Sequence, residues 1–349
     1  MRRFICGACS IASIVFGGWA ASHLAAAGFD GQQPPTAEPA AKSVDRPAVR
    51  KFTFHYRFRV KGLKSAGAGN TVRVWLPSPS GTVDQDVTRL PAAAPADLAE
   101  NREAAFGNRI LYFEAPIPAD GALAVDVPYE IVRREVRRDA AHLAAVPQER
   151  LDEVKRTLFL KADTMVPTSG KALKLLDSVE LRDDKLARAR QLYDIVDRHV
   201  VYKKEGTGWG RGDTNWVCDN GYGNCTDFHS LFMSLARSQG MPARFEIGFS
   251  IPTDVKQGPI AGYHCWAWVH LDDRWIPVDI SEADKHPEMK EYYFGNLTAD
   301  RVMFSQGRDL ELVPKSAKPP LNFFIYPYIE VAGNPLPKEN VELDFAFEE

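Results

Sequence analysis

The chain is poor in cysteine, balanced in charge and free of internal repeats. Five cysteines among 349 residues are too few for a disulfide-dense scaffold. The 43 basic and 46 acidic residues leave a net charge of −3, which argues against nucleic acid as a partner. Beyond the first 27 residues there is no apolar run of the length that spans a membrane. The length of 349 residues is enough for two globular domains.

The first 27 residues have the pattern of a secretory signal. The basic start Met1–Arg3 is followed by an uncharged apolar stretch, residues 4–21, and Ala25–Ala27 supplies small residues for cleavage. We therefore expect a signal peptide over residues 1–27 and a periplasmic or secreted protein that has no membrane contact after cleavage. An uncleaved anchor is the alternative. Residues 28–48, dominated by Pro, Ala, Gln and Glu, are typical of a flexible linker.

Residues 49–140 carry patterns typical of short β-strands. Apolar and polar residues alternate within each segment, and loops rich in Pro, Ala and Gly separate the segments. This pattern predicts a small N-terminal β-sandwich domain. The predicted strands include residues 52–60, 71–76, 110–114 and 123–127.

Residues 145–349 form the predicted second domain, so that the whole chain belongs to the α+β class. Helical periodicity begins near Gln148 and returns from Asp184 to His199. The segments Asn322–Val331 and Val341–Phe347 are predicted strands. We expect these two strands to close the second domain.

Cys225 stands at the start of a predicted helix. Asn224 is a favoured N-cap residue, and Asp227 three positions later completes a pattern like a capping box. Apolar residues then recur at helical spacing over Phe228–Leu235, and Gly240 ends the pattern. A cysteine at the first helical position faces free backbone N–H groups and the positive end of the helix dipole, which favour the thiolate. Cys225 is therefore a candidate nucleophile.

His264 and Asp279 lie on two predicted strands that form a hairpin. The strands Tyr263–Leu271 and Arg274–Ile280 flank the two-residue turn Asp272–Asp273. A turn of that length makes Asp279 the diagonal neighbour of His264 on one face, with backbones about 7–8 Å apart, a gap that the two side chains can bridge. We expect Asp279 to hold one ring nitrogen of His264 while the other faces the thiol.

The segments around these three residues resemble the transglutaminase-like superfamily. The resemblance rests on Asn-Cys-Thr-Asp-Phe-His-Ser-Leu-Phe from residue 224, Gly-Met-Pro-Ala-Arg from residue 240, Tyr-His-Cys-Trp-Ala from residue 263 and Trp-Ile-Pro-Val-Asp from residue 275. It covers about residues 150–310. It implies a papain-like core in which Cys225 is the nucleophile, His264 the general base and acid, and Asp279 the orienting residue. The superfamily includes cross-linking enzymes, peptidases, deglycosylating enzymes and inactive members, so the resemblance leaves the reaction open.

The predicted function is that of a thiol enzyme acting on amide bonds of a peptide or protein through a Cys225 acyl-enzyme. Hydrolysis, by a peptidase or amidase, is the first prediction. Transfer of the acyl group to an amine, which cross-links proteins, is the second, because the same acyl-enzyme serves both reactions. A non-catalytic binding protein that retains the fold is the third. We expect no cofactor and no metal.

A zinc site is the chemical alternative to a nucleophilic thiol. The residues that could bind the ion are Cys218, Cys225, His229, His264 and Cys265, which offer enough soft ligands for a tetrahedral site. The spacing of these five contains no Cys-x-x-Cys or His-x-x-x-His pair, which argues against that interpretation.

Other residues could replace members of the triad. His229 stands four residues after Cys225 on the same predicted helix, but helical geometry sets that distance poorly for proton transfer. Glu282 and Asp284 follow Asp279 closely and could take its role, although they fall beyond the predicted strand.

The oxyanion donors are expected to come from two places. One is the backbone N–H of Cys225, at the start of its helix. The second is predicted in the glycine-rich segment Val201–Asn220, which we expect to be a loop at the wall of the substrate cleft. Trp209, Asn215 and Trp216 are equal candidates within it.

Three cysteines, Cys218, Cys225 and Cys265, would remain after removal of the signal peptide. An odd number in an oxidising compartment indicates one functional thiol and one bridge. Strand alternation turns Cys265 to the face opposite His264, and so away from the nucleophile. We therefore expect a Cys218–Cys265 disulfide, with two buried free thiols as the alternative.

Overall fold

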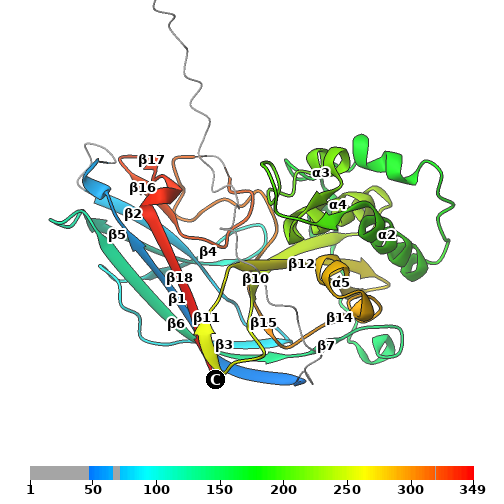
Figure 1. Ribbon diagram of the computed structural model, residues 1–349, viewed down its shortest axis with the longest axis horizontal. Helices are drawn as coiled ribbons and strands as arrows, with labels where there is room; N and C mark the ends of the chain where they lie inside the picture. Colours follow the sequence, from blue (N-terminus) through cyan, green and yellow to red (C-terminus); the bar gives the residue numbers. More distant parts are fainter. Residues whose placement is uncertain (1–46, 66–70, 319) are drawn as a thin grey trace, which may run out of the picture.

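A computed structural model describes residues 47–65, 71–318 and 320–349 of the chain. The predicted signal peptide and almost all of the predicted linker lie outside these residues. Within the described part, no helix combines the length and the apolar character needed to cross a membrane. In Figure 1 a block of β-sheet fills one half of the molecule and the helices gather in the other. Strands β10 (Ala243–Ser250) and β12 (Tyr263–Leu271) cross between the two halves.

Two five-stranded antiparallel sheets make up the β-rich half, as predicted for a β-sandwich. Along β1 (Val49–Val60) every second side chain is buried, including Phe54 and Tyr56, because one face of the strand lies on the core. The sheets have the strand orders β11-β18-β1-β6-β3 and β17-β16-β2-β5-β4. The remaining strands of the first sheet are β11 (Gln257–Pro259), β18 (Val341–Glu348), β6 (Leu123–Arg134) and β3 (Gln85–Arg89), and those of the second are β17 (Asn334–Pro335), β16 (Tyr328–Val331), β2 (Thr71–Ser78), β5 (Arg109–Pro116) and β4 (Ala99–Arg102).

Strands from the C-terminal part of the chain complete this sandwich. Strand β18 pairs with β1 over its whole length, and β16 pairs with β2. Residues 322–331 and 341–347 were expected to close the catalytic domain, and that expectation is wrong, although both segments contain strands. An alternating strand fits any sheet that buries one face, so only the long-range pairing decides where it belongs.

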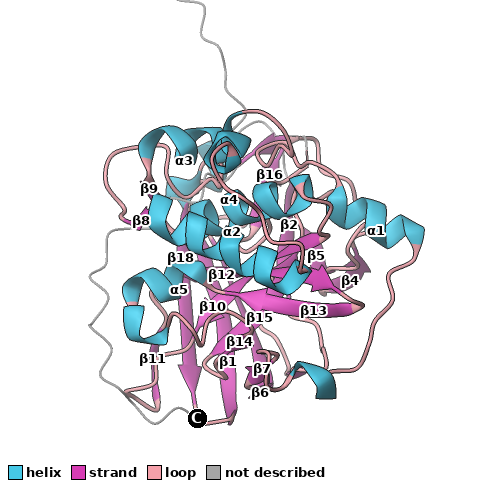
Figure 2. Cartoon of the chain, turned by 90° about the vertical axis from the view of Figure 1, so that its right-hand side faces the viewer, coloured by secondary structure: helices cyan, strands magenta, loops and turns pink. Residues whose placement is uncertain are grey.

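The second half consists of a four-stranded sheet covered by helices. The sheet has the order β13-β12-β10-β15, with β13 at Arg274–Val278 and β15 at Arg301–Gln306. Helix α4 (Cys225–Ser238) packs on β12, and Figure 2 shows α4 and α2 (Lys185–His199) in front of the sheet. The other helices are α1 (Glu153–Leu160), α3 (Thr214–Asn220) and α5 (Ile280–Lys285), and two short strand pairs join β7 (Val136–Arg137) to β14 (Asn296–Leu297) and β8 (Val201–Tyr202) to β9 (Tyr222–Gly223).

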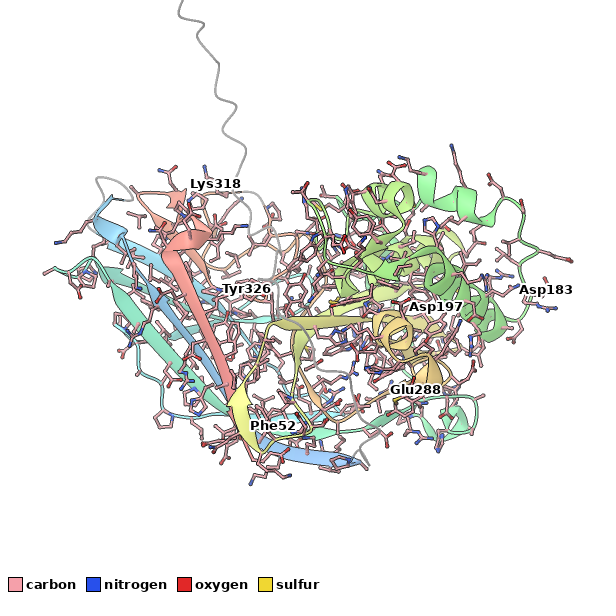
Figure 3. All side chains as sticks on the ribbon, in the orientation of Figure 1. Phe52, Asp183, Asp197, Glu288, Lys318 and Tyr326 are labelled. Carbon is pink, nitrogen blue, oxygen red and sulfur yellow. The ribbon has the colours of Figure 1, made fainter. Side chains whose placement is uncertain are left out.

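Aromatic side chains join the two halves. Tyr326, labelled between them in Figure 3, places its ring 5.9 Å from that of Tyr263 in β12 and 6.1 Å from that of Phe345 in β18. On the face of β12 away from α4, the guanidinium of Arg301 lies 5.1 Å from the ring of Trp266. The four-stranded sheet is therefore held on both sides, which fixes the strand that carries His264.

Candidate active site

The start of helix α4 has the predicted geometry. Asn224 is the N-cap, Cys225 is the first helical residue, and Asn224 and Asp227 form a complete capping box. Cys225 is only 2% exposed, so the thiol is buried rather than on the surface. No hydrogen bond from its backbone N–H to a described residue is present, which leaves that donor free for a ligand.

The hairpin that carries His264 and Asp279 also has the predicted register. Asp272 and Asp273 both adopt positive φ, at 46° and 59°, as a two-residue turn of this type requires, and Leu271 pairs with the first residue of β13. The β-ladder ends at Val278. Asp279 is therefore the N-cap residue of helix α5 and does not extend the strand. Nε2 of His264 lies 2.7 Å from Oδ2 of Asp279.

The thiol and the imidazole form a buried ion pair. With Nε2 held by Asp279, the Nδ1 atom of His264 is left for the hydrogen bond with Cys225. Burial raises the pKa of Cys225, but hydrogen bonds from Cys265 and His264 and the charge of His264 outweigh burial and hold that pKa well below its usual value. Burial disfavours the charged imidazole, yet Asp279 and the thiolate raise the pKa of His264 to about 10. Both shifts favour the thiolate and the imidazolium at neutral pH.

Arg301 is a member of this site that the sequence patterns did not single out. Its Nη1 lies 2.7 Å from Oδ2 of Asp279, and its Nη2 donates to Thr298 at 3.1 Å. Burial opposes the charge on Asp279, but His264 and then Arg301 hold its pKa well below the usual range. An arginine at the start of the buried strand β15 needs an anionic partner, because its guanidinium is buried. The sequence could not say which carboxylate that partner is.

The expected orientation of Cys265 is wrong. Strand alternation does separate it from His264, but the face of β12 that carries Cys265 is the one covered by α4. Its Sγ therefore lies 3.8 Å from Thr226 Oγ1 and 3.6 Å from Nδ1 of His229, and hydrogen-bonds the nucleophile. Cys265 is thus part of the thiol's surroundings.

The predicted Cys218–Cys265 disulfide is absent. Cys218, Cys225 and Cys265, which are the cysteines of the described residues, are all free. Cys218 lies in α3, where burial raises its pKa to about 11, so it is an unreactive thiol. The bridge failed as a prediction because it required Cys265 to face away from α4.

His229 supports the site without replacing His264. Its Nε2 accepts a hydrogen bond from the backbone N–H of Ile280 at 3.1 Å, and burial lowers its pKa, so the ring is neutral. Nδ1 then carries the proton and points toward Cys265 and the backbone of Cys225. The ring joins the start of α4 to the start of α5.

The two alternatives to Asp279 are engaged elsewhere. Glu282 accepts from Lys285 at 2.9 Å, and its backbone N–H donates to the Asp279 carboxylate. Asp284 accepts from the backbone N–H of Tyr202. Neither carboxylate hydrogen-bonds His264 in the described structure, so Asp279 is the orienting group that the geometry offers.

The three candidates for the second oxyanion donor are now distinguishable. Asn215 and Trp216 lie in helix α3 instead of a loop, and both of their backbone N–H groups donate to the N-cap residue Asp213. The indole of Trp216 packs edge-on against Tyr222. Trp209 is 6% exposed, and its indole N–H is buried without a hydrogen-bond partner among the described residues. Of the three candidates, it is the one whose buried N–H lacks an acceptor in the described structure.

The described residues contain no cluster of three or more His, Cys, Asp or Glu side chains arranged to hold a metal ion. Of the five residues considered for zinc, Cys218 lies apart in helix α3. The other four lie together at the Cys225 thiol, where they hydrogen-bond one another or Asp279.

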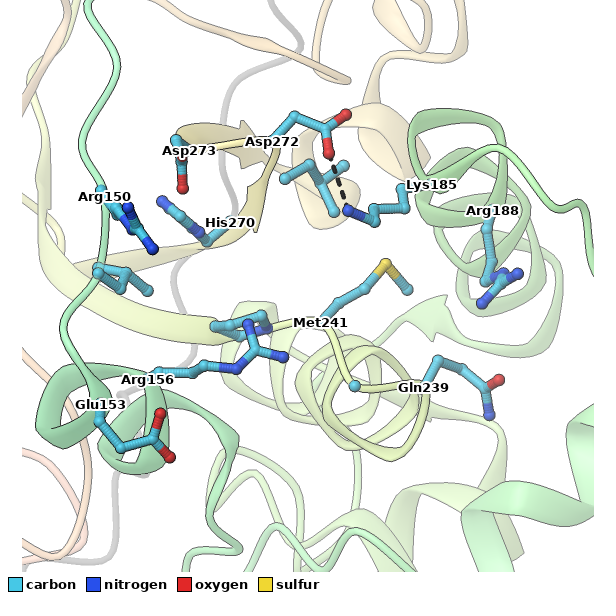
Figure 4. A pocket seen from close by; sticks show the side chains of 14 residues that line it. Arg150, Glu153, Arg156, Lys185, Arg188, Gln239, Met241, His270, Asp272 and Asp273 are labelled. Atoms are coloured by element: carbon cyan, nitrogen blue, oxygen red, sulfur yellow. Dashed lines mark hydrogen bonds and ion pairs between the residues drawn. The ribbon is translucent and has the colours of Figure 1, made fainter.

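A cavity of about 510 Å³ lies away from the triad. It adjoins the C-terminal end of α4 and the hairpin tip, whereas Cys225 is at the opposite end of a helix about 21 Å long. Figure 4 shows Lys185 paired with Asp272 at this cavity, with Arg156 and His270 also on its wall. None of the triad residues lines it, so it is not the catalytic cleft.

Comparison with known proteins agrees with the fold. An uncharacterized protein of Haemophilus influenzae is 30% identical over 219 residues, which cover 52% of this chain and 59% of that protein. The match thus spans about three fifths of that relative's length. The structure of a candidate cysteine protease from Cytophaga hutchinsonii is similar in fold, with a TM-score of 0.55 at 13% identity over 87% of this chain and 92% of that one.

A narrower segment carries the family relationship. Residues 174–280 match the profile of the transglutaminase-like superfamily core. The segment begins ahead of α2 and runs to the start of α5, and so holds Cys225, His264 and Asp279 together with the glycine-rich loop. This chain therefore contains a segment similar to the transglutaminase-like superfamily core, within a mixed α and β fold.

Proposed function

We propose that this protein is a thiol hydrolase of amide bonds in a peptide or protein, acting through an acyl-enzyme on Cys225. The observation that carries the proposal is the buried arrangement of Cys225 beside His264, whose Nε2 lies 2.7 Å from the Asp279 carboxylate; these neighbours lower the pKa of Cys225 and raise that of His264. A thiol kept only for packing would be neutral, because burial alone raises a cysteine pKa. Here three neighbours, Cys265, His264 and His229, lower the pKa of Cys225 instead.

Acylation begins when the Cys225 thiolate attacks the carbonyl carbon of the amide, forming the C–S bond and moving the π electrons to oxygen. The oxyanion is stabilised by the backbone N–H of Cys225 and, in our proposal, by the indole N–H of Trp209. His264 then gives its Nδ1 proton to the amide nitrogen, and the C–N bond breaks. The amine leaves, and the acyl group stays on sulfur.

Deacylation reverses these roles. Neutral His264 takes a proton from water as the water oxygen attacks the thioester carbon. The tetrahedral intermediate collapses with cleavage of the C–S bond, which releases the carboxylic acid and restores thiolate and imidazolium. Asp279 and Arg301 keep the ring in one tautomer and orientation through both halves.

Transfer of the acyl group to an amine is the second candidate. Cys225 is 2% and His264 5% exposed, and a site from which water is excluded favours an amine that binds over bulk water. A binding protein that retains the fold is the third, and the depressed pKa of Cys225 speaks against it. From the basic and apolar N-terminal sequence we also propose a periplasmic or secreted location.

The test is a direct trap of the acyl-enzyme. A peptide library containing side-chain and C-terminal amides is mixed with the protein, quenched in acid within seconds and examined by intact mass spectrometry. We expect an acyl adduct on Cys225, its absence in Cys225→Ala and its retention in Cys218→Ala, because Cys218 is a free thiol outside the site.

The same reaction decides between the candidates. Hydrolysis yields peptide acids even when a fluorescent primary amine is present in excess, whereas acyl transfer incorporates the amine. If no peptide leaves an adduct and Cys225 is alkylated no faster than a denatured thiol, the catalytic proposal fails and a binding role replaces it.

A further inference from the structure

Asp227 is a buried carboxylate that does more than cap its own helix. Its Oδ2 accepts from the backbone N–H of Asn224 at 2.9 Å and from that of Gly210 at 2.6 Å. Its Oδ1 accepts from the backbone N–H of Gly212 at 3.0 Å. Two of these three donors belong to the glycine-rich loop, fifteen and seventeen residues away in the chain. The carboxylate therefore ties that loop to the helix that begins with the nucleophile.

The loop can reach the carboxylate only in an unusual backbone conformation. Gly210 has a φ of 82°, in the left-handed region that other residues avoid. This conformation turns the Gly210 N–H toward Asp227. Trp209 is the residue just before it, so this turn fixes the backbone from which the indole projects. The indole N–H has no partner among the described residues.

A second set of contacts ties the loop to the catalytic strand. The hydroxyl of Tyr263, next to His264 in β12, lies 3.4 Å from the carbonyl oxygen of Gly210 and accepts from Asn224 Nδ2 at 2.9 Å. Gly210 is thus held from its N–H side by the nucleophile helix and from its C=O side by the strand of the general base. No comparable contact is needed merely to cap a helix.

We propose that Asp227 is a positioning residue that holds the 209–212 loop so that the Trp209 indole N–H points at the oxyanion formed on the Cys225 acyl carbon. The inference rests on the proposed function, because it needs an acyl-transfer step. The inference goes beyond that function because it assigns a role to Asp227, which contacts neither the substrate nor the proton of the thiol. Asp227 acts through Trp209, by way of the backbone of Gly210.

The energetics of Asp227 fit this role. Burial raises its pKa to about 7, against the effect of the three N–H donors. Keeping a carboxylate here therefore costs stability that an exposed N-cap would not cost. Asn in its place has a single acceptor oxygen. It could accept either from the N–H groups of Asn224 and Gly210 or from that of Gly212, but not from all three. The carboxylate is the smallest side chain that bonds the loop at two points.

The test compares two reactions of the same thiol. Acylation by p-nitrophenyl acetate forms an oxyanion, whereas alkylation by iodoacetamide does not. We expect Asp227→Asn and Trp209→Phe each to slow acylation by about 100-fold, the usual effect of losing one oxyanion donor. Alkylation of Cys225 should stay within about 3-fold of the parent protein, which a merely unfolded or distorted helix start would not allow.

The double variant decides whether Asp227 acts through Trp209. If it does, Asp227→Asn combined with Trp209→Phe acylates no more slowly than the worse single variant. Effects that multiply would overturn the proposal, and so would a parallel loss of alkylation, because Asp227 would then act on the thiolate. If the parent protein is alkylated but never acylated, the proposed function fails as well. This result is distinct from failure of the Asp227 proposal alone, in which the parent protein is still acylated.

Two further variants test whether a folding defect could explain the loss of acylation. Gly210→Ala leaves Asp227 intact and opposes the positive φ, so it should reproduce the acylation defect with normal alkylation. Asp184→Asn removes the carboxylate cap of α2, outside the site, and should change neither reaction. Circular dichroism on all variants records folding, and a Gly210→Ala protein with full acylation would contradict the proposal.

Discussion

Arg301 and His264 share one oxygen atom of Asp279: Nη1 of Arg301 and Nε2 of His264 each lie 2.7 Å from Oδ2. The carboxylate thus balances two cations at once, and both contacts are buried. Since the guanidinium is itself fixed by Thr298 and by the Trp266 ring, the imidazole is oriented by a chain of contacts that reaches strand β15. The orientation of the general base depends on the sheet as much as on its own hairpin.

Removing Arg301 should therefore destabilise the fold. Arg301→Met leaves the Asp279 charge without one of its cations, and loss of one partner of a buried pair costs about 3–5 kcal/mol. Urea unfolding measures the change. The matched control is Arg57→Met, which breaks the exposed pair with Asp344 and should cost less than about 1 kcal/mol. Equal effects in the two variants would show that the buried contact contributes nothing.

Asp279→Asn should lose turnover, and it should also lower stability because the buried guanidinium of Arg301 loses its anionic partner. Asn can still hydrogen-bond the ring, but it favours the tautomer with the proton on the wrong nitrogen and no longer stabilises the imidazolium. A fall in kcat of about 10⁴-fold is expected from this loss. Glu282→Gln is the control, because that carboxylate is paired with Lys285 and should leave most of the rate. If Glu282→Gln proves the more damaging, the orienting role belongs to Glu282.

Alkylation of Cys225 should begin at unusually low pH. The pKa of the thiol is depressed, so the rate rises as pH increases through that low value and then stays level until His264 loses its proton near pH 10. Iodoacetamide rates between pH 4 and pH 11 give the profile. A single midpoint at or above about 8.5, the ordinary thiol value, would contradict the ion pair.

Cys265→Ala should shift that midpoint upward. The Cys265 side chain hydrogen-bonds the thiolate, and its removal takes away one of the groups that lower the Cys225 pKa. His264→Ala should shift it further, because the imidazolium contributes both a hydrogen bond and a charge. The alkylation profiles of the two variants, measured beside Cys218→Ala, check the order. An unchanged Cys265→Ala profile would remove this thiol from the site.

Gly248 should be intolerant of a side chain. A Cβ atom at this position would lie 1.7 Å from the carbonyl oxygen of Val302, where β10 meets β15 at an irregularity in the register. Gly248→Ala should cost about 3 kcal/mol or more, since backbone must move to admit the methyl group. Gly81→Ala, whose Cβ would meet only Gln85 at 3.7 Å, should stay within about 1 kcal/mol. Thermal unfolding of both proteins provides the comparison.

Local sequence predicted the parts of the site that depend on local geometry. Asn224 and Asp227 fix the helix start, and the Asp272–Asp273 turn fixes which residues of the hairpin share a face. These features follow from a few neighbouring residues, so they could be read before any tertiary contact was known. The β-sandwich strands followed from alternation in the same way.

The parts that failed depend on contacts distant in sequence. Alternation showed that Cys265 and His264 face opposite ways, but only the packing of α4 decides which face meets the nucleophile. The partner of Arg301 is 22 residues away, and the partners of β18 are nearly 290 residues away. No local pattern specifies such pairs, because every buried strand and every buried charge presents the same local requirement.

The pairing of β1 with β18 has a consequence for biosynthesis. On the ribosome, β1 emerges nearly 290 residues before the strand that covers one of its edges. Until then that edge, with its free N–H and C=O groups, is open to pairing with another chain. The sandwich can therefore be completed only after translation of the catalytic half. We infer that nascent chains halted before residue 341 are the forms most prone to aggregate and most in need of a chaperone.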